Sequence, residues 1–235
     1  MCFFLTEQWR AYRNEDGSKK KQKALPMFVL RKMLEIANSE WDRAVSWLLI
    51  GAIFFAMRSC EYLETKAKEE DRRTRILRLR NFKFRVKGGI VNWEAKDIHE
   101  GDLVIITFEY QKNDKRDVRV HQFSTTDSVL NPVLAWANTI YRLKKIPGVS
   151  GDTKVSMILE GGKVSKIKAD QVRIHLRSVV MLVGETALGF SIDDIGLYSI
   201  RSGGAMAMVL SRVPDIVTMK IGRWSSLAFL EYIRD

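Results

Sequence analysis

The segment ILRLRNFKFRV (76–86) alternates apolar residues with basic or polar ones, as expected for a β-strand with one face in water. Gly88 and Gly89 follow as a turn into a second short apolar run, IVNW (90–93). LVIITFEYQ (103–111) and RDVRVHQF (116–123) flank the polar tip KNDK, which predicts a β-hairpin with a four-residue loop. Residues 76–123 are therefore expected to form a small antiparallel sheet of three or four strands.

Helical patterns lie on both sides of this sheet segment. Before it, Pro26 is placed to begin a helix over 26–38, and Ser39 to cap a second helix over 40–57. After it, the spacing of apolar residues predicts helices over 132–145, 168–187, 201–212 and 215–222, with Ser225 capping a last helix that ends at Arg234. The expected fold class is α+β and mostly α, a helical domain with a small antiparallel sheet.

The composition is globular and strongly basic. Of the 235 residues, 46% are hydrophobic, and 39 Lys and Arg against 28 Asp and Glu give a net charge of +11. Such an excess favours polyanionic partners, either nucleic acid or an anionic membrane surface, although a soluble protein can be basic without such a partner. The most apolar stretch, AVSWLLIGAIFFAM (44–57), is shorter than the about 20 residues that span a bilayer, and indicates a buried helix of a soluble core.

The absence of several catalytic motifs argues against the enzyme classes that carry them. The sequence has no GxxxxGK[ST], HExxH or GxSxG motif, no CxxC pair, and three histidines without metal-ligand spacing. We therefore expect neither a metal nor a cofactor. What remains is arginine and lysine beside tyrosine. Chemistry on a phosphodiester without a metal needs fixed cations on the non-bridging oxygens, a proton donor for the leaving oxygen, and a nucleophile.

Three arginines stand where they could bind one anion. Arg58 closes the predicted apolar helix, and Glu61 follows one turn later, where it could brace the arginine. Arg201 opens a predicted helix, where its guanidinium and the free backbone N–H groups would face one anion together. Arg223 lies directly before Trp224 and the last predicted helix. Taken singly, each arginine fits a surface salt bridge or an ordinary helix terminus better.

Four segments together resemble the catalytic domain of tyrosine recombinases. They are FFAMRSCEYLE (54–64), QKNDKRD (111–117), YSIRSGGAMAMVLSRVP (198–214) and IGRWSSLAFLEYIRD (221–235). They look closest to the phage-integrase-like recombinases of eukaryotic DIRS- and Crypton-type mobile elements. The resemblance covers about residues 26–235, with the segments in the family's order and a tyrosine nine residues after Arg223.

The resemblance implies both a site and a reaction. Arg58 matches the first catalytic arginine and Glu61 the acid of the same motif, while Lys112 matches the hairpin lysine beside the scissile phosphate. Arg201 matches the arginine of the HxxR box, and Tyr232 matches the nucleophile. In the family this tyrosine attacks a DNA phosphate, giving a 3′-phosphotyrosyl link and a free 5′-hydroxyl, and reversal completes strand exchange without metal or ATP. The implied function is DNA recombination or integration of a mobile element, on double-stranded DNA.

Two positions depart from the family pattern. Tyr198 stands where the HxxR box has its histidine, and a neutral phenol is a poor base near pH 7, so weakened activity is expected. Counting back nine residues from Tyr232 places Arg223 at the family's His/Trp position, whereas matching the aromatic residue places Trp224 there. We favour Trp224 as the packing and hydrogen-bonding member, with Arg223 as the alternate.

The expected organisation is a linker or remnant over 1–25 and a catalytic domain over 26–235, truncated just after the nucleophile. Residues 1–25 are too short for the helical DNA-clamping domain that family members carry upstream. A homo-tetramer on paired sites is therefore expected only of a longer protein. No membrane partner is expected, and the location should be intracellular, and nuclear in a eukaryote.

Two alternatives remain open at this point. One is a catalytically weak or inactive DNA-binding module of the same fold, since 201–223 has the pattern of two short helices joined at Val213-Pro214, as in a helix-turn-helix. The other is a relative of type IB topoisomerases, which would share the chemistry but relax supercoiled DNA.

Overall fold

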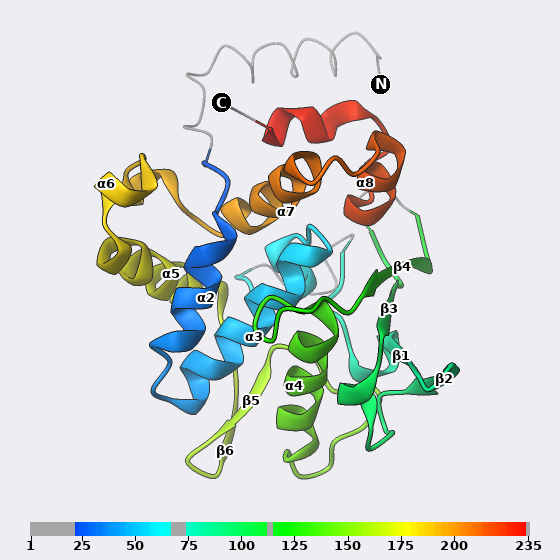
Figure 1. Ribbon diagram of the computed structural model, residues 1–235. Helices are drawn as coiled ribbons and strands as arrows, with labels where there is room; N and C mark the ends of the chain where they lie inside the picture. Colours follow the sequence, from blue (N-terminus) through cyan, green and yellow to red (C-terminus); the bar gives the residue numbers. More distant parts are fainter. Residues whose placement is uncertain (1–21, 67–73, 112–114, 234–235) are drawn as a thin grey trace, which may run out of the picture.

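The computed structural model describes residues 22–66, 74–111 and 115–233, except for the side chains of Ala228 and Tyr232. Within these residues, helices surround a central buried helix, and a four-stranded antiparallel sheet lies to one side of it (Figure 1). The helices are α2 (Met27–Glu35), α3 (Glu40–Phe54), α4 (Pro132–Lys144), α5 (Ala169–Val183), α6 (Glu185–Leu188), α7 (Tyr198–Leu210) and α8 (Asp215–Gly222). Short 3₁₀ helices are η1 (Ser59–Glu61), η2 (Leu79–Asn81), η3 (Ile98–Glu100), η4 (Ile192–Asp194) and η5 (Leu227–Tyr232). The predicted fold class, α+β and mostly α, is confirmed.

The sheet has the strand order β2-β1-β3-β4, with every neighbouring pair antiparallel. Its strands are β1 (Phe82–Val86), β2 (Gly89–Asn92), β3 (Leu103–Phe108) and β4 (Val118–Phe123). The predicted hairpin is confirmed as the pair β3–β4. The first strand is shorter than predicted, because the Asn81 side chain accepts a hydrogen bond from the backbone N–H of Arg78 (2.7 Å) and supports a 3₁₀ turn there.

A second hairpin was not predicted. It consists of β5 (Met157–Glu160) and β6 (Lys163–Lys166), which turn at Gly161 and Gly162. Both glycines have positive φ angles, of 55° and 77°, in the region that glycine enters without steric cost. The Gly-Gly pair after the apolar residues 157–159 was therefore a usable turn signal.

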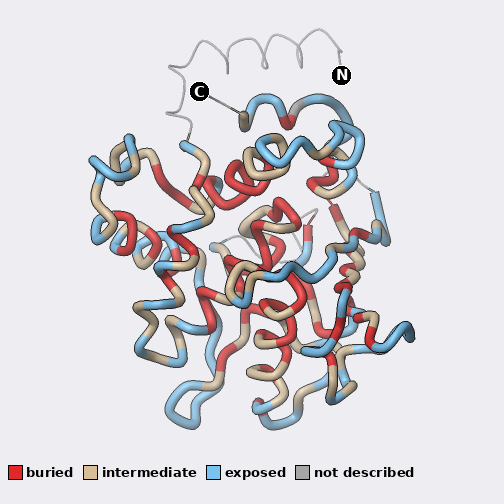
Figure 2. Tube along the Cα trace, in the orientation of Figure 1, coloured by how far each residue is buried: buried red, intermediate tan, exposed pale blue. Residues whose placement is uncertain are grey.

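Helix α3 is the centre of the core. Ser39 caps it as predicted, and its hydroxyl and the Asp42 carboxylate bond each other's backbone N–H groups at 3.0 and 3.1 Å. The helix is buried over most of its length (Figure 2). It ends at Phe54, three residues before the predicted end, because Ala56 has a φ of 42° and turns the chain. Arg58 therefore follows the helix across a short turn and precedes η1.

Helix α7 lies against the end of α3, where two glycines permit close approach. A Cβ on Gly204 would lie 2.2 Å from the carbonyl oxygen of Ile53, and one on Gly203 would lie 2.4 Å from that of Leu25. The helix begins at Tyr198, so the prediction that Arg201 opens it was wrong, and Arg201 lies one turn inside.

The remaining helix bounds agree with the predictions to within a few residues. Two helices differ from the prediction in more than their bounds. The predicted helix over 168–187 is interrupted at Gly184, whose φ is 92°, and continues as the separate turn α6. The last helix is the 3₁₀ helix η5 and not an α-helix beginning after Ser225. In the described ranges, none of the helices is both long and apolar enough to cross a bilayer.

Candidate functional site

The end of α3 gathers five of the side chains that the sequence singled out. They come from η1, from α7 and from the residues that follow α8, and they are Arg58, Glu61, Arg201, Arg223 and Trp224. We call these five residues the arginine cluster. Lys112 lies outside the described residues, as does the side chain of Tyr232.

Glu61 holds two of the arginines. Its carboxylate accepts hydrogen bonds from the backbone N–H of Arg58 (2.8 Å) and from Arg58 Nη1 (3.3 Å). Oε2, the oxygen that accepts the backbone N–H of Arg58, also accepts a bond from Arg223 Nη2 at 2.7 Å. The side chains of Glu61 and Arg223 are each only 1% exposed, so this is a fully buried ion pair.

Arg201 is fixed by main-chain carbonyls. Its Nη1 donates to the carbonyl oxygen of Ala56 and its Nη2 to that of Gly222 (2.8 Å). The guanidinium also lies 4.3 Å from the centre of the Trp224 ring, within cation–π range. The residue is only 1% exposed. Because carbonyls just after the end of a helix carry partial negative charge, they suit a buried cation.

Arg223 is also buried. It has the left-handed φ of 58°, its Nη1 donates to the carbonyl oxygens of Phe55 and Ile221 at 3.0 Å, and its guanidinium lies 3.7 Å from the ring centre of Phe108. Burial lowers its pKa to about 10, an effect that Glu61 opposes and that Arg201 and Arg58 reinforce. It is therefore still charged at neutral pH.

The charges of the cluster do not cancel. Three guanidinium groups lie near one carboxylate, and the pKa of Arg223 responds to Glu61, Arg201 and Arg58 together. Like charges in a partly dehydrated site repel, so this excess of positive charge favours an anion. Arg58, with a quarter of its side chain exposed, is the member that solvent reaches most easily. The cluster can thus bind an anion through Arg58 and stabilise it through the positive charges of the buried Arg201 and Arg223.

The segment that carries Tyr232 is anchored beside this cluster. The fully buried ring of Phe229, in η5, lies 5.8 Å from the ring of Trp224, and η5 packs against α7 and α8. The backbone of Tyr232 ends η5. Tyr198, at the start of α7, is by contrast half exposed, and its backbone N–H donates to Gln22 Oε1 at 3.0 Å.

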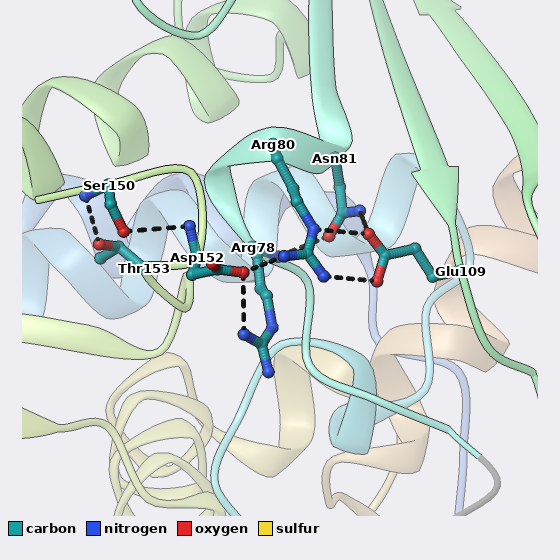
Figure 3. Close-up of polar contacts among 7 residues, drawn as sticks. All are labelled: Arg78, Arg80, Asn81, Glu109, Ser150, Asp152 and Thr153. Atoms are coloured by element: carbon teal, nitrogen blue, oxygen red, sulfur yellow. Dashed lines mark hydrogen bonds and ion pairs between the residues drawn. The ribbon is translucent and has the colours of Figure 1, made fainter.

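A polar network fixes the chain where β3 ends and the loop of the β3–β4 hairpin begins (Figure 3). Arg80 donates from Nε and Nη2 to the Glu109 carboxylate at 2.8 and 3.1 Å, and from Nη1 to Asp152. Asn81 Nδ2 donates to the same Glu109 carboxylate at 2.8 Å. Glu109 stands three residues before Lys112, so the network holds the strand that leads to that lysine.

This network predicts acid-sensitive stability. The hydrogen bond from Arg80 lowers the pKa of Glu109 from its usual 4.5. The stability from this pair is therefore full above about pH 4.5 and is lost as the pH falls through the lowered pKa. We expect Arg80→Met to lower the free energy of unfolding by about 1 kcal/mol at neutral pH, because the pair is partly exposed. Urea titrations in steps down to about pH 3 should show this difference shrinking.

The control is Arg43→Met. Arg43 pairs with Glu40 at 3.5 Å, and both side chains are about half exposed. This variant should change stability little at any pH. A difference between Arg80→Met and wild type that did not vary with pH would contradict the role given to Glu109.

The sequence did not reveal two features of this region. The pairing of Glu61 with Arg223, across 162 positions, has no signature in spacing. The second feature is a stack of Arg75 and Arg116 on Tyr110, which basic residues beside an aromatic at a hairpin tip could have suggested. The described residues contain no group of three or more His, Cys, Asp and Glu side chains that could hold a metal ion.

Comparisons with known proteins identify the fold. The sequence matches no family model and no curated protein. Among solved structures, the XerH site-specific recombinase bound to difH substrate in a pre-cleavage complex matches with a TM-score of 0.54 and 15% identity, covering 94% of this chain and 53% of XerH. The post-cleavage complex of XerH with palindromic difH substrate gives 0.56 and 16%, covering 93% and 51%. The chain thus spans about half the length of these structures and has a tyrosine recombinase-like fold.

Proposed function

We propose that this chain is the catalytic domain of a tyrosine recombinase that cuts and rejoins duplex DNA through a 3′-phosphotyrosyl link at Tyr232. The observation that carries the proposal is the arginine cluster, in which three guanidinium groups lie close together with a single carboxylate, which is bonded to two of them. A DNA phosphate is an anion of the size and charge that such a cluster favours. The fold likeness to a recombinase solved with its DNA substrate supports the same function.

The reaction needs little more than positioning and charge. In the proposed step the Tyr232 phenol loses its proton to solvent, its oxygen attacks phosphorus, the bond to the 5′-oxygen breaks, and Lys112 gives that oxygen a proton. A phenol of pKa about 10 is a weak nucleophile at neutral pH unless nearby cations favour the phenolate. Arg58 binds the non-bridging oxygens, while Arg201 and Arg223 supply a fixed positive field that costs no rearrangement during the reaction. Rejoining is the reverse step with another 5′-hydroxyl.

The test is covalent capture on DNA of unspecified sequence. The chain is incubated with a pool of nicked duplexes of randomised sequence, from which the cut fragment diffuses away and leaves the adduct trapped. We expect a detergent-resistant protein–DNA adduct, formed equally with a metal chelator present, whose DNA-linked peptide contains Tyr232. The absence of an adduct, or a link to another residue, would overturn the proposal.

A second candidate, a DNA-binding module without catalysis, is favoured by one observation. Arg201 is almost fully buried under Trp224, so DNA cannot touch it in this conformation. In that case the same duplex pool is bound but no adduct forms. A role in the recombination or integration of a mobile element, a tetramer on paired sites and a nuclear location extend the first proposal, and these rest on the sequence resemblance.

A further inference from the structure

Two exposed arginines stack on one tyrosine beside the arginine cluster. The Arg75 guanidinium lies 4.0 Å from the ring centre of Tyr110, and the Arg116 guanidinium lies 5.2 Å from it. Both arginines are exposed, and Tyr110 is partly exposed. Within the described ranges, neither arginine forms a salt bridge. Among the described residues, the stack is therefore a pair of cations held on an aromatic ring without a carboxylate partner.

The neighbouring arginines differ from this pair. Arg80 is bonded to Glu109 and Asp152, Arg78 is bonded to Asp152, and Arg85 forms a two-pronged bond with Asp102. Each of these three cations thus has a carboxylate partner within the fold. Arg75 and Arg116 have no such carboxylate partner among the described residues, so they are available to bind a negative charge on another molecule.

The stack adjoins the proposed site by strand geometry. Phe108, whose ring lies under Arg223, precedes Tyr110 by two residues, and alternate residues of an extended chain share a face about 7 Å apart. Glu109, between them, bonds Arg80 and Asn81 instead. The segment that carries Arg75 also adjoins the arginine cluster. The backbone N–H of Leu77, two residues after Arg75, donates to the carbonyl oxygen of Glu61 at 2.9 Å.

The chemistry of a stacked guanidinium suits a phosphate. The π face of the group is used by the ring, while its N–H donors point outward in the plane and can bind two phosphate oxygens. Two such cations repel each other across one ring, and a polyanion relieves that repulsion. We propose that Arg75 and Arg116 bind backbone phosphates of DNA that flank the phosphate held by the arginine cluster, and that Tyr110 positions them. This inference rests on the proposed function for the identity of the ligand.

The experiment measures how DNA affinity depends on salt. Binding of a fluorescent duplex is followed by anisotropy over about 50 to 200 mM salt, since each phosphate contact contributes about 0.9 to the slope of log affinity against log salt. Because affinity falls as salt rises, this slope is negative. We expect Arg75→Ala and Arg116→Ala each to reduce the magnitude of the slope by about 1, and the double variant to reduce it by about 2, for any duplex sequence. Equal slopes for the double variant and wild type would overturn the inference.

Two further variants separate charge from position. Arg85→Ala is the matched control, because Arg85 is also close to a ring, 5.5 Å from that of Phe123, but is neutralised by Asp102, and its slope should equal that of wild type. Tyr110→Leu keeps both charges, so it should weaken binding about two- to fivefold without changing the slope. Tyr110→Phe keeps the ring and should restore the affinity. A loss of slope in Arg85→Ala equal to that in Arg75→Ala would contradict the assignment.

The two proposals fail separately. Salt-dependent binding that needs Arg75 and Arg116, without an adduct at Tyr232, refutes the recombinase reaction and leaves the phosphate contact intact. An adduct at Tyr232 with an unchanged slope in the double variant refutes the contact alone. No salt-dependent binding by the unsubstituted chain refutes both.

Discussion

Arg201→Lys is expected to slow formation of the covalent DNA adduct by about 10²-fold, because it displaces one charge of the fixed positive field at the developing anion. The guanidinium donates to two separate carbonyl oxygens, of Ala56 and Gly222, and stacks on Trp224. A lysine ammonium keeps the charge but is a point donor without a flat face, so it cannot reproduce this geometry. The measurement is the single-turnover rate on a nicked duplex that wild type has been shown to cleave.

The control for this prediction is Arg142→Lys. Arg142 is a partly buried arginine that likewise donates to two carbonyl oxygens, of Met157 and Val155, but it joins α4 to β5, away from the cluster. This variant should lose comparable stability and, below its melting temperature, cleave at the wild-type rate. Tyr232→Phe, which lacks the proposed nucleophilic hydroxyl, is the negative control and should form no adduct. Equal slowing by the two arginine variants would show that the effect comes from stability and not from the site.

Glu61→Gln should lower the free energy of unfolding by about 3–5 kcal/mol, because it leaves the buried Arg223 without its counter-charge. The carboxylate accepts hydrogen bonds from Arg223 and Arg58, and an amide of the same shape turns an N–H group toward one of them. Urea unfolding at neutral pH measures the loss. Because a bound phosphate supplies the missing charge, added DNA should stabilise the variant more than it stabilises wild type.

Glu35→Gln provides the comparison. Glu35 pairs with Lys32 at 3.4 Å, and both side chains are about half exposed, so a change of less than about 1 kcal/mol is expected. A loss of only that size for Glu61→Gln would mean that water reaches the carboxylate and that the cluster is not a buried charge system.

The fold was predictable from local signals, and the errors are local too. Alternation predicted the β3–β4 hairpin, and Ser39 predicted the start of α3. The end of α3 was placed too late because the apolar run continues through Met57, whereas the turn at Ala56 depends on packing that a sequence pattern does not contain. Arg201 was placed at the start of a helix, where it would face solvent, whereas it lies one turn inside α7 and is buried. Its partners there, the carbonyls of Ala56 and Gly222, are too distant in sequence to be predicted from a local pattern.

For the site, the motifs named candidate residues but not how these residues contact one another. The resemblance named Arg58, Glu61 and Arg201, and the structure brings them to one end of α3. It offered Arg223 and Trp224 as alternatives for one position, yet both lie in the cluster with different contacts: the first pairs with Glu61, and the second covers Arg201. The positions of Lys112 and of the Tyr232 side chain remain predictions from the sequence.

The carbonyl anchors of the cluster bear on how such a protein can diverge. Arg201 and Arg223 are held largely by the main-chain oxygens of Phe55, Ala56 and Gly222, which every amino acid possesses. A substitution at either of the first two positions therefore does not remove these hydrogen bonds, so long as the path of the backbone is kept. Such an arrangement allows these side chains to change while the positions of the two charges are kept.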